Sequence, residues 1–402
     1  MGVALGFQAP GGLARLACVV ASIATARASL QPTHRSAPAP PRPEALTDDD
    51  IPVLDIARLM RGEYGADDVR ALGRACASPG FFHVVNHGVP AAVIEDFEAA
   101  MRDFFTRQTP EQKRRVKRTA TNSRGYADDE FTKRTRDVKE MYDYGHRPRR
   151  DLPPDAPENV VLDGHNQLPD GLPGFAGAVE AYYDACARVC DGLLRGVAAS
   201  LDLDPGAFDG LFGGGHTSYL RMNYYPPHVG ARFAAADANL DDERLAAGAE
   251  DDQATPLGAL GGPRLGVNRH FDAGCLTLLY QDPSCSALQV NVRAHAGGAP
   301  RWASVDPVAG ALTVNVGDML QVLSNGAYRA PEHRVLASAP GAERFSAPFF
   351  YNPAYDAEVR PLAGAAPRYG PFSYGYWRRR RFEGDFADEG KPEIQISDYL
   401  LE

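Results

Sequence analysis

Apolar side chains recur with a helical period along much of the first half of the chain. They do so in residues 67–77, 92–107 and 175–197, and residues three or four apart share one face of a helix. These segments therefore predict amphipathic helices, and Thr109 before Pro110 predicts the start of another. The longest stripe is expected to pack into the core rather than bind a cofactor, and it consists of Phe175, Val179, Tyr182, Cys186, Val189, Leu193 and Val197.

The pattern changes in the second half of the chain. From Tyr219 onward, short apolar segments such as residues 276–280 are separated by turns rich in glycine and proline. This alternation is typical of a jelly roll, the double-stranded β-helix of cupin-like proteins. Together with the helices and a strand at residues 80–86, it predicts a mixed α+β fold. Residues 119–170 are polar and rich in charge, proline and glycine, so they are predicted to be loop.

The first 45 residues have a different composition. No Asp or Glu precedes Glu44, and arginines recur among Ala, Ser and Pro. The apolar stretch at residues 16–26 is too short to span a bilayer comfortably, and Ala26-Arg27-Ala28 resembles a cleavage site. Residues 1–45 therefore predict a removable targeting segment, with plastid or mitochondrion favoured over secretion. An uncleaved disordered tail on a cytoplasmic protein is the alternative.

Composition narrows the class of protein. The chain has 402 residues and a net charge of −10, which argues against a nucleic-acid-binding surface. The six cysteines include no Cys-x-x-Cys pair, so a reduced interior is expected rather than a disulfide framework. The sequence contains no second long apolar segment, so we expect no membrane span in the mature protein. The basic run at residues 378–381 is expected to be the solvated face of a C-terminal helix.

Two histidines and an aspartate offer metal-binding chemistry. His270 and Asp272 are two residues apart beside the apolar run at 276–280, and such residues share one face of a strand. Phe271 would then point towards a core. His333 follows a Ser-Asn-Gly turn and precedes a predicted strand. Two imidazoles and one carboxylate can hold non-haem Fe(II) and leave positions open. The alternative is a hydrogen-bonded His-Asp pair at a strand end.

Arg344 and Ser346 form a second pair at a spacing of two residues. A guanidinium group and a hydroxyl on one strand face could hold a carboxylate at two points. Taken alone, Arg344 could equally be an ordinary surface arginine.

The chain resembles a known family over residues 50–400. The family pattern His-x-Asp-x-Gly-x-Leu-Thr-Leu-Leu-x-Gln-Asp is matched by residues 270–282. Leu220-Arg221-Met222-Asn223-Tyr224-Tyr225-Pro226 resembles its Asn-Tyr-Tyr-Pro motif, and further similar blocks stand in order at residues 51–55, 80–89, 288–290, 314–322 and 324–326. The family is that of the iron(II)/2-oxoglutarate-dependent dioxygenases, in the branch that includes isopenicillin N synthase and the plant flavonoid and gibberellin oxidases.

This resemblance implies an organisation and a reaction. It implies an N-terminal dioxygenase domain at 50–165, a jelly-roll domain at 172–360 and a C-terminal helical segment at 361–402. The implied reaction oxidises a small organic molecule with O2 while 2-oxoglutarate becomes succinate and CO2, with ascorbate as a supporting reductant. The implied Fe(II) ligands are His270, Asp272 and His333. The residues implied to hold 2-oxoglutarate are Arg344, Ser346, Tyr225 and Asn223.

Some alternatives stay open within the same family. Isopenicillin N synthase and the ethylene-forming oxidase carry the same motifs without using 2-oxoglutarate, and a binding module that has lost iron is a third possibility. The chain also departs from the plant members by an acidic insertion at 231–262, a lid or a disordered segment, and by Phe271. The sequence does not identify the prime substrate or the oligomeric state.

Overall fold

A computed structural model describes residues 51–401, except for 120, 133–134, 137–138, 146–163, 213–214, 228–264, 293–300, 338–340, 365 and 386–393. The predicted targeting segment and the acidic insertion therefore lie outside the described residues. Within that described part, no helix is long and apolar enough to cross a membrane.

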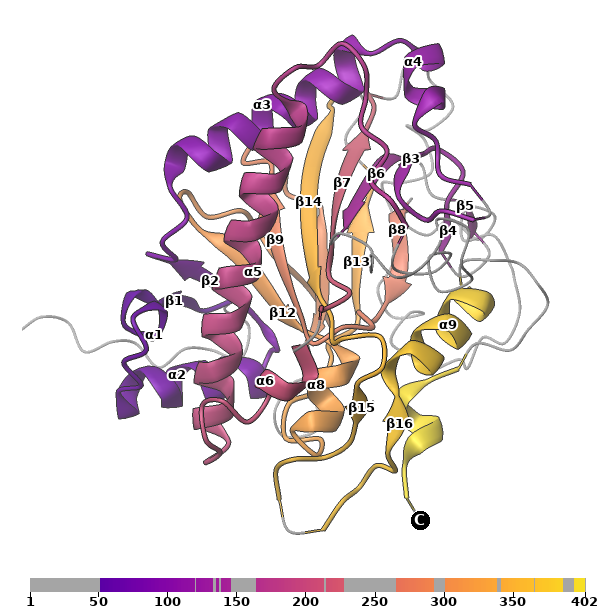
Figure 1. Cartoon of the computed structure of the whole chain (residues 1–402). Coiled ribbons are helices and arrows are strands. Elements are labelled where there is room, and N and C mark those ends of the chain that lie inside the picture. Colours follow the sequence, from indigo (N-terminus) through magenta and orange to yellow (C-terminus); the bar gives the residue numbers. More distant parts are fainter. Residues whose placement is uncertain are drawn as a thin grey trace, which may run out of the picture. The chain divides into compact units, whose positions relative to one another are not determined.

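Two sheets form the predicted jelly roll (Figure 1). The larger sheet has the strand order β1 (Val53–Asp55), β2 (Phe81–Val85), β12 (Leu312–Val316), β9 (Leu276–Gln281), β14 (Arg344–Tyr351), β7 (Tyr219–Tyr225), β6 (Glu140–Gly145) and β3 (Gly125–Ala127). The smaller sheet has the order β11 (Arg301–Ser304), β10 (Leu288–Val292), β13 (His333–Leu336) and β8 (Leu265–His270). Two short pairs, β4 (Phe131–Thr132) with β5 (Thr135–Arg136) and β15 (Glu358–Val359) with β16 (Phe372–Ser373), complete the strands described.

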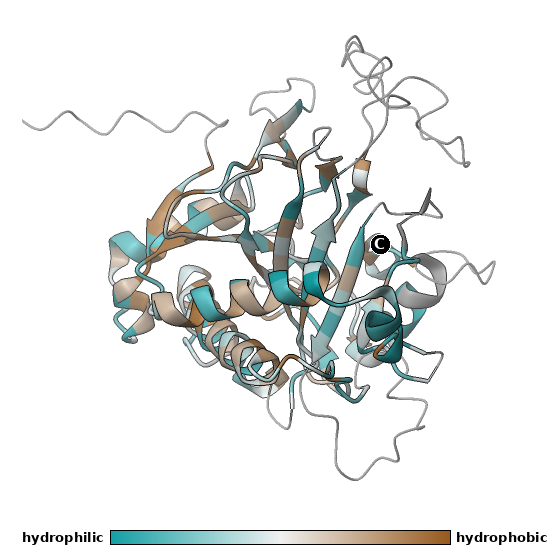
Figure 2. Ribbon diagram, turned by 90° about the horizontal axis from the view of Figure 1, so that it is seen from above, coloured by the Kyte–Doolittle hydropathy of each residue, from teal (hydrophilic) through white to brown (hydrophobic). Residues whose placement is uncertain are grey.

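The predicted helices α2 (Ala66–Ala77), α3 (Ala91–Arg107) and α5 (Phe175–Ser200) cover the larger sheet (Figure 1). Figure 2 shows hydrophilic and hydrophobic residues mixed along these helices, as expected when one face is buried. Every residue of the α5 stripe is buried, including Cys186. The five cysteines in the described part are free. Thr109 and Gln112 form a capping box at the start of α4 (Pro110–Arg115).

The remaining helices are short or lie near the C-terminus. α1 (Ala57–Met60) packs against α5, α6 (Asp209–Phe212) lies between α5 and β7, and α8 (Asp318–Leu323) lies between β12 and β13. α9 (Tyr374–Asp385) and the 3-10 helix η3 (Ile396–Tyr399) lie in the C-terminal segment, which also contains β16.

The prediction that residues 119–170 form a loop is wrong in part, because they contain β3 and β6. β6 pairs with β7 along its whole length. The sequence did not indicate β6 because the strand contains a charged residue that is buried. Asp143 is 4 % exposed and forms an ion pair with Arg221 of β7 at 2.8 Å. The charge of buried Asp143 is thus compensated by an arginine on the neighbouring strand, and a periodic apolar pattern cannot reveal such a partner.

The prediction of a solvated basic face on the C-terminal helix is also wrong. In α9, Arg378 is 7 % exposed and Arg381 is 2 % exposed, whereas Arg379 between them is exposed. Residues three apart lie on the same side of a helix, and here this side faces the protein. The four consecutive arginines therefore do not form one solvated surface.

Candidate active site

The three predicted metal ligands meet at one end of the smaller sheet. His270 is the last residue of β8 and lies opposite His333, the first residue of β13. Asp272 lies in the turn that follows β8, and not within a strand as the spacing suggested. One nitrogen from each histidine and one carboxylate oxygen lie within 4.8 Å of one another. This turn brings Asp272 close to the two histidines, whereas the sequence predicted that a continuous strand would do so.

Backbone carbonyls set the orientation of both imidazole rings. Nδ1 of His270 lies 2.8 Å from the carbonyl of Asn268, and Nδ1 of His333 lies 3.2 Å from that of Pro331. A carbonyl oxygen only accepts, so each Nδ1 carries a hydrogen, and the lone pair of a neutral ring is then on Nε2. Both Nε2 atoms lie 3.6 Å from Oδ1 of Asp272. This is the tautomer that metal ligation requires.

The carboxylate of Asp272 is oriented from its other side. Oδ2 accepts hydrogen bonds from Oγ1 of Thr277 at 2.6 Å and from Nδ2 of Asn315 at 2.8 Å. Oδ1 is thereby directed towards the two histidines. Burial alone would raise the pKa of Asp272, but the neighbouring imidazoles and these two hydrogen bonds outweigh burial and lower it. The aspartate is therefore ionised.

Loss of hydration lowers the pKa of His270 well below its ordinary value, and the nearby His333 lowers it further. A neutral imidazole has a lone pair to donate. The cluster therefore offers one nitrogen from each of two histidines and one carboxylate oxygen, which is the donor set of a non-haem Fe(II) site.

The four residues predicted to hold 2-oxoglutarate lie together on two neighbouring strands. β14 pairs with β7 so that Arg344 is opposite Tyr225 and Ser346 is opposite Asn223. The guanidinium carbon of Arg344 lies 4.9 Å from the centre of the Tyr225 ring, and Nη1 donates to Oγ of Ser346 at 3.2 Å. Arg344 is 1 % exposed, so it is not the surface arginine that its sequence context allowed.

Two polar atoms at this end of the pocket have no hydrogen-bond partner among the described residues. They are Nε of Arg344 and Oδ1 of Asn223, and both are buried. Buried polar atoms without a partner are costly. A small anionic ligand with several oxygens would compensate the arginine, so the residues present fit a bound 2-oxo acid.

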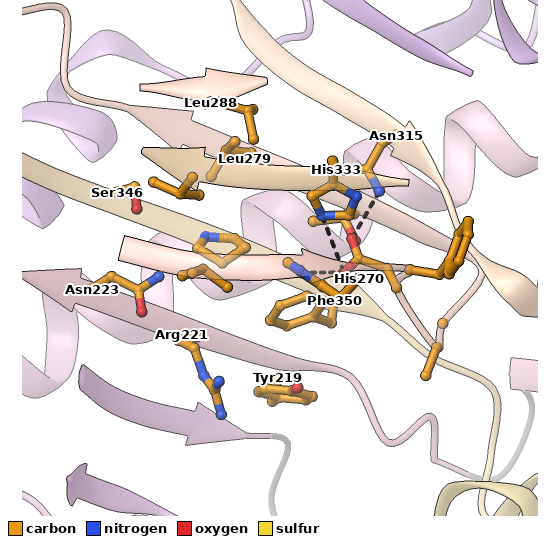
Figure 3. A pocket seen from close by; sticks show the side chains of 18 of the residues that line it. Tyr219, Arg221, Asn223, His270, Leu279, Leu288, Asn315, His333, Ser346 and Phe350 are labelled. Carbon is orange, nitrogen blue, oxygen red and sulfur yellow. Dashed lines mark hydrogen bonds and ion pairs between the residues drawn. The ribbon is translucent and has the colours of Figure 1, made fainter. Parts of the chain in front are cut away.

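One pocket between the two sheets contains both groups of residues. Figure 3 shows Asn223 and Ser346 at one end and His270, His333 and Asn315 farther along. Apolar side chains also line the pocket, and among them Leu279 and Leu288 are buried. The prediction that Phe271 faces a core needs correction, because Phe271 is only half-buried and lines this pocket.

Sequence reasoning missed the residues that orient Asp272. Thr277 and Asn315 lie directly opposite each other on β9 and β12, in strands whose residues are all buried. A polar residue inside a buried strand must find a partner, and this signal could have identified both. Arg378 and Arg381 also line the pocket, although they were expected to be solvated.

Comparisons with known proteins agree with this geometry. The sequence profile of the 2OG-Fe(II) oxygenase superfamily matches residues 216–353, and the profile described as non-haem dioxygenase in morphine synthesis N-terminal matches residues 51–171. A homoarginine-6-hydroxylase of Arabidopsis thaliana is 32% identical over 324 residues, which cover 78% of this chain and 87% of that protein.

Solved structures share the fold. JOX2, in complex with 2OG, Fe and JA, has a TM-score of 0.64 at 24% identity and covers 88% of this chain and 89% of its own. A dioxygenase for auxin oxidation from rice has a TM-score of 0.59 at 27% identity and covers 85% and 98%. The matched profiles and the hydroxylase relative support a 2-oxoglutarate-dependent reaction rather than one that does without this co-substrate. The chain belongs to the 2OG-Fe(II) oxygenase superfamily and is a 2-oxoglutarate-dependent non-haem iron dioxygenase.

Proposed function

We propose that His270, Asp272 and His333 hold the Fe(II) of this dioxygenase. The supporting observation is the convergence of one oxygen and two oriented nitrogens within 4.8 Å. Bound Fe(II) supplies the oxygen-activating chemistry, and the 2-His-1-carboxylate set leaves coordination positions for the co-substrate and O2. The carbonyls of Asn268 and Pro331 hold the imidazoles in the metal-binding tautomer.

We further propose that Arg344 and Ser346 bind the distal carboxylate of 2-oxoglutarate, with Tyr225 beside them and Asn223 orienting the chelating end. A charge-assisted pair in a dry pocket sets direction as well as affinity. The buried, unpartnered Nε of Arg344 supports this role. The apolar lining keeps bulk water away from the reacting centre.

The names of the relatives do not agree on a prime substrate. Homoarginine stands in one name and auxin in another. We therefore propose only a small organic molecule, oxidised with release of succinate and CO2.

Replacing Asp272 tests the metal assignment. Asp272→Ala should abolish Fe(II) binding, because the two remaining imidazoles lack the anionic ligand. Metal content after anaerobic reconstitution measures the loss, and circular dichroism checks the fold. Asp306→Ala removes an exposed carboxylate and should bind iron like the wild type. Iron bound at full stoichiometry by Asp272→Ala would refute the assignment.

Replacing Arg344 tests the co-substrate assignment. A hydrogen bond to a charged group contributes about 1.5–3 kcal/mol, so Arg344→Gln should weaken 2-oxoglutarate binding roughly 10- to 100-fold. Its Fe(II) affinity should change little. Titration of each ligand separates the two effects, and Arg379→Gln is the control with the same change of charge on the surface. Equal losses for both ligands would mean that Arg344 is structural.

We also propose that residues 1–45 direct the protein to a plastid or mitochondrion. The support is compositional: arginines without acidic residues before Glu44. Fusion of residues 1–45 to a fluorescent protein tests this, and diffuse cytoplasmic fluorescence would favour the alternative of an uncleaved tail.

A further inference from the structure

A single arginine of α3 contacts residues at the ends of both β9 and β14. Nη2 of Arg102 lies 2.9 Å from Oδ2 of Asp282, the residue that follows β9. Nη1 lies 3.6 Å from Oε1 of Glu343, the residue that precedes β14. Nε donates to Oε1 of Glu98 on the same helix at 3.0 Å. The guanidinium group thus joins α3 to the end of one strand and to the start of its neighbour.

The same guanidinium group lies against the ring of Phe345. Its central carbon is 4.3 Å from the ring centre, which is within the range of a cation–π contact. Phe345 is fully buried and stands between Arg344 and Ser346 in β14. Successive side chains of a strand point to opposite faces. Arg102 therefore contacts the back of the strand segment whose other face carries the two residues proposed to bind the distal carboxylate.

The carboxylate that Arg102 contacts beyond β9 is itself held in place. Asp282 is 2 % exposed, and its Oδ1 accepts hydrogen bonds from the backbone nitrogen and from Oγ of Ser284 at 3.0 and 2.6 Å. Burial would raise the pKa of Asp282, but the hydrogen bonds from Ser284 and the charge of Arg102 lower it. The backbone nitrogen of Asp282 also donates to the carbonyl of Phe345 at 3.1 Å. An ionised carboxylate fixed to β14 thus anchors Arg102.

The position of Arg344 depends on the backbone of β14. Arg344 is the first residue of that strand, and its guanidinium group donates to Oγ of Ser346 on the same strand at 3.2 Å. A binding group must be held within about 0.5 Å of its productive position. A shift at the start of β14 would therefore displace Arg344 from the co-substrate. The proposed metal ligands would be spared, because they lie on β8, on β13 and in the turn after β8.

We propose that Arg102 is a positioning residue for 2-oxoglutarate, and this inference rests on the proposed function of Arg344. Arg102 does not line the pocket. It holds Phe345 and Asp282 so that the start of β14 presents Arg344 and Ser346 to the distal carboxylate. Loss of Arg102 should weaken only the part of binding that the distal carboxylate provides.

Two 2-oxo acids of equal length test this proposal. 2-Oxoglutarate and 2-oxopentanoate share the chelating end, but 2-oxopentanoate lacks the distal carboxylate. Calorimetry measures the binding of each to the full chain loaded with Fe(II) in the absence of oxygen. Arg102→Gln should weaken 2-oxoglutarate binding about 3- to 30-fold. Affinities for 2-oxopentanoate and Fe(II) should stay within about twofold of the wild type, which also shows that the site is folded.

Two further variants of α3 serve as controls. Arg107→Gln removes an exposed arginine that pairs with Asp103 of the same helix, and it should leave both affinities unchanged. Arg102→Lys keeps the charge but lacks the planar fork of donors, so it should recover part of the preference for 2-oxoglutarate.

A double-mutant cycle identifies the residue through which Arg102 acts. In the Arg344→Gln background, Arg102→Gln should lower 2-oxoglutarate affinity by less than about twofold more. Equal losses in both backgrounds would overturn the proposal, because Arg102 would then act independently of Arg344. Equal losses for the two 2-oxo acids would also overturn it, since a merely structural residue would give that result.

Asp282→Asn carries the test if Arg102→Gln does not fold. It keeps an oxygen for Ser284 but removes the charge that anchors Arg102, and it should reduce the preference for 2-oxoglutarate in the same way. A loss in Arg344→Gln without any loss in the folded test variant would refute the role of Arg102 alone. No loss of 2-oxoglutarate affinity in Arg344→Gln would refute the proposed function, and the role of Arg102 with it.

Discussion

At the scale of single residues, the site depends on which oxygen of Asp272 is available. Thr277 and Asn315 both donate to Oδ2, and both histidines face Oδ1. The carboxylate is therefore oriented before any metal binds. Partners of this kind contribute to metal affinity by holding the ligand in place.

Removing one of these partners should weaken metal binding. Asn315→Leu keeps a similar volume but deletes the donor to Oδ2, so Fe(II) affinity should fall about 10- to 100-fold. Competition with a chelator of known affinity measures the change. Asn291→Leu replaces an asparagine of β10 that is hydrogen-bonded to Glu332 and serves as the control. An Fe(II) affinity equal to that of the wild type would show that Asn315 does not orient the ligand.

At the scale of elements, α3 and α5 are joined to the larger sheet by aromatic packing. Phe97 of α3 stacks on Tyr182 of α5 with ring centres 4.1 Å apart, and it meets Tyr280 of β9 edge-on at 6.4 Å. All three side chains are buried. One residue thus connects two helices and the sheet that carries the site.

Truncation of Phe97 should destabilise this layer. Phe97→Ala removes a fully buried ring, and such changes cost about 3–5 kcal/mol. Chemical denaturation measures the free energy of unfolding, and Phe97→Leu should cost less because it fills more of the cavity. A loss below about 1 kcal/mol for the alanine variant would contradict this packing argument.

At the scale of the whole molecule, an ionic network joins the early strands to the jelly roll. Arg221 of β7 contacts Glu130 and also Asp143 of β6, and Lys139 contacts Glu130 as well. Burial opposes ionisation of Glu130, but Arg221 and Lys139 outweigh burial and lower its pKa to about 2. The ion pairs of Glu130 in this network therefore contribute to stability only while Glu130 is ionised.

The sign of the pH dependence follows from that lowered pKa. The unfolded chain binds a proton near pH 4.5, so stabilisation by Glu130 is complete above this pH and is lost as the pH falls towards 2. The wild type should be more stable than Glu130→Gln at pH 7, and the pH-dependent part of the difference is about 3 kcal/mol. Denaturant unfolding at pH 7, 4 and 3 should show the gap narrowing. A constant gap would contradict the assignment.

Much of the site could be predicted from residues close together in the chain. The spacing of His270 and Asp272, and of Arg344 and Ser346, indicated both groups of residues proposed to bind ligands, and helical periodicity predicted α5. The strand β6 and the buried face of α9 could not be predicted in the same way. In β6 the charge of Asp143 is compensated by Arg221 on another strand, and in α9 two arginines face a pocket. From local periodicity alone, such charged residues are predicted to be solvated.

The sequence by itself determined the chemistry, the helices and the jelly roll, because residue types and apolar periods are local properties. Only the tertiary structure decided which atoms meet. Asn315 reaches Asp272 across a strand pair, and Arg378 reaches the pocket from a helix more than one hundred residues beyond His270. Contacts between distant segments arise from packing and from the compensation of buried charge, and a linear pattern does not record them.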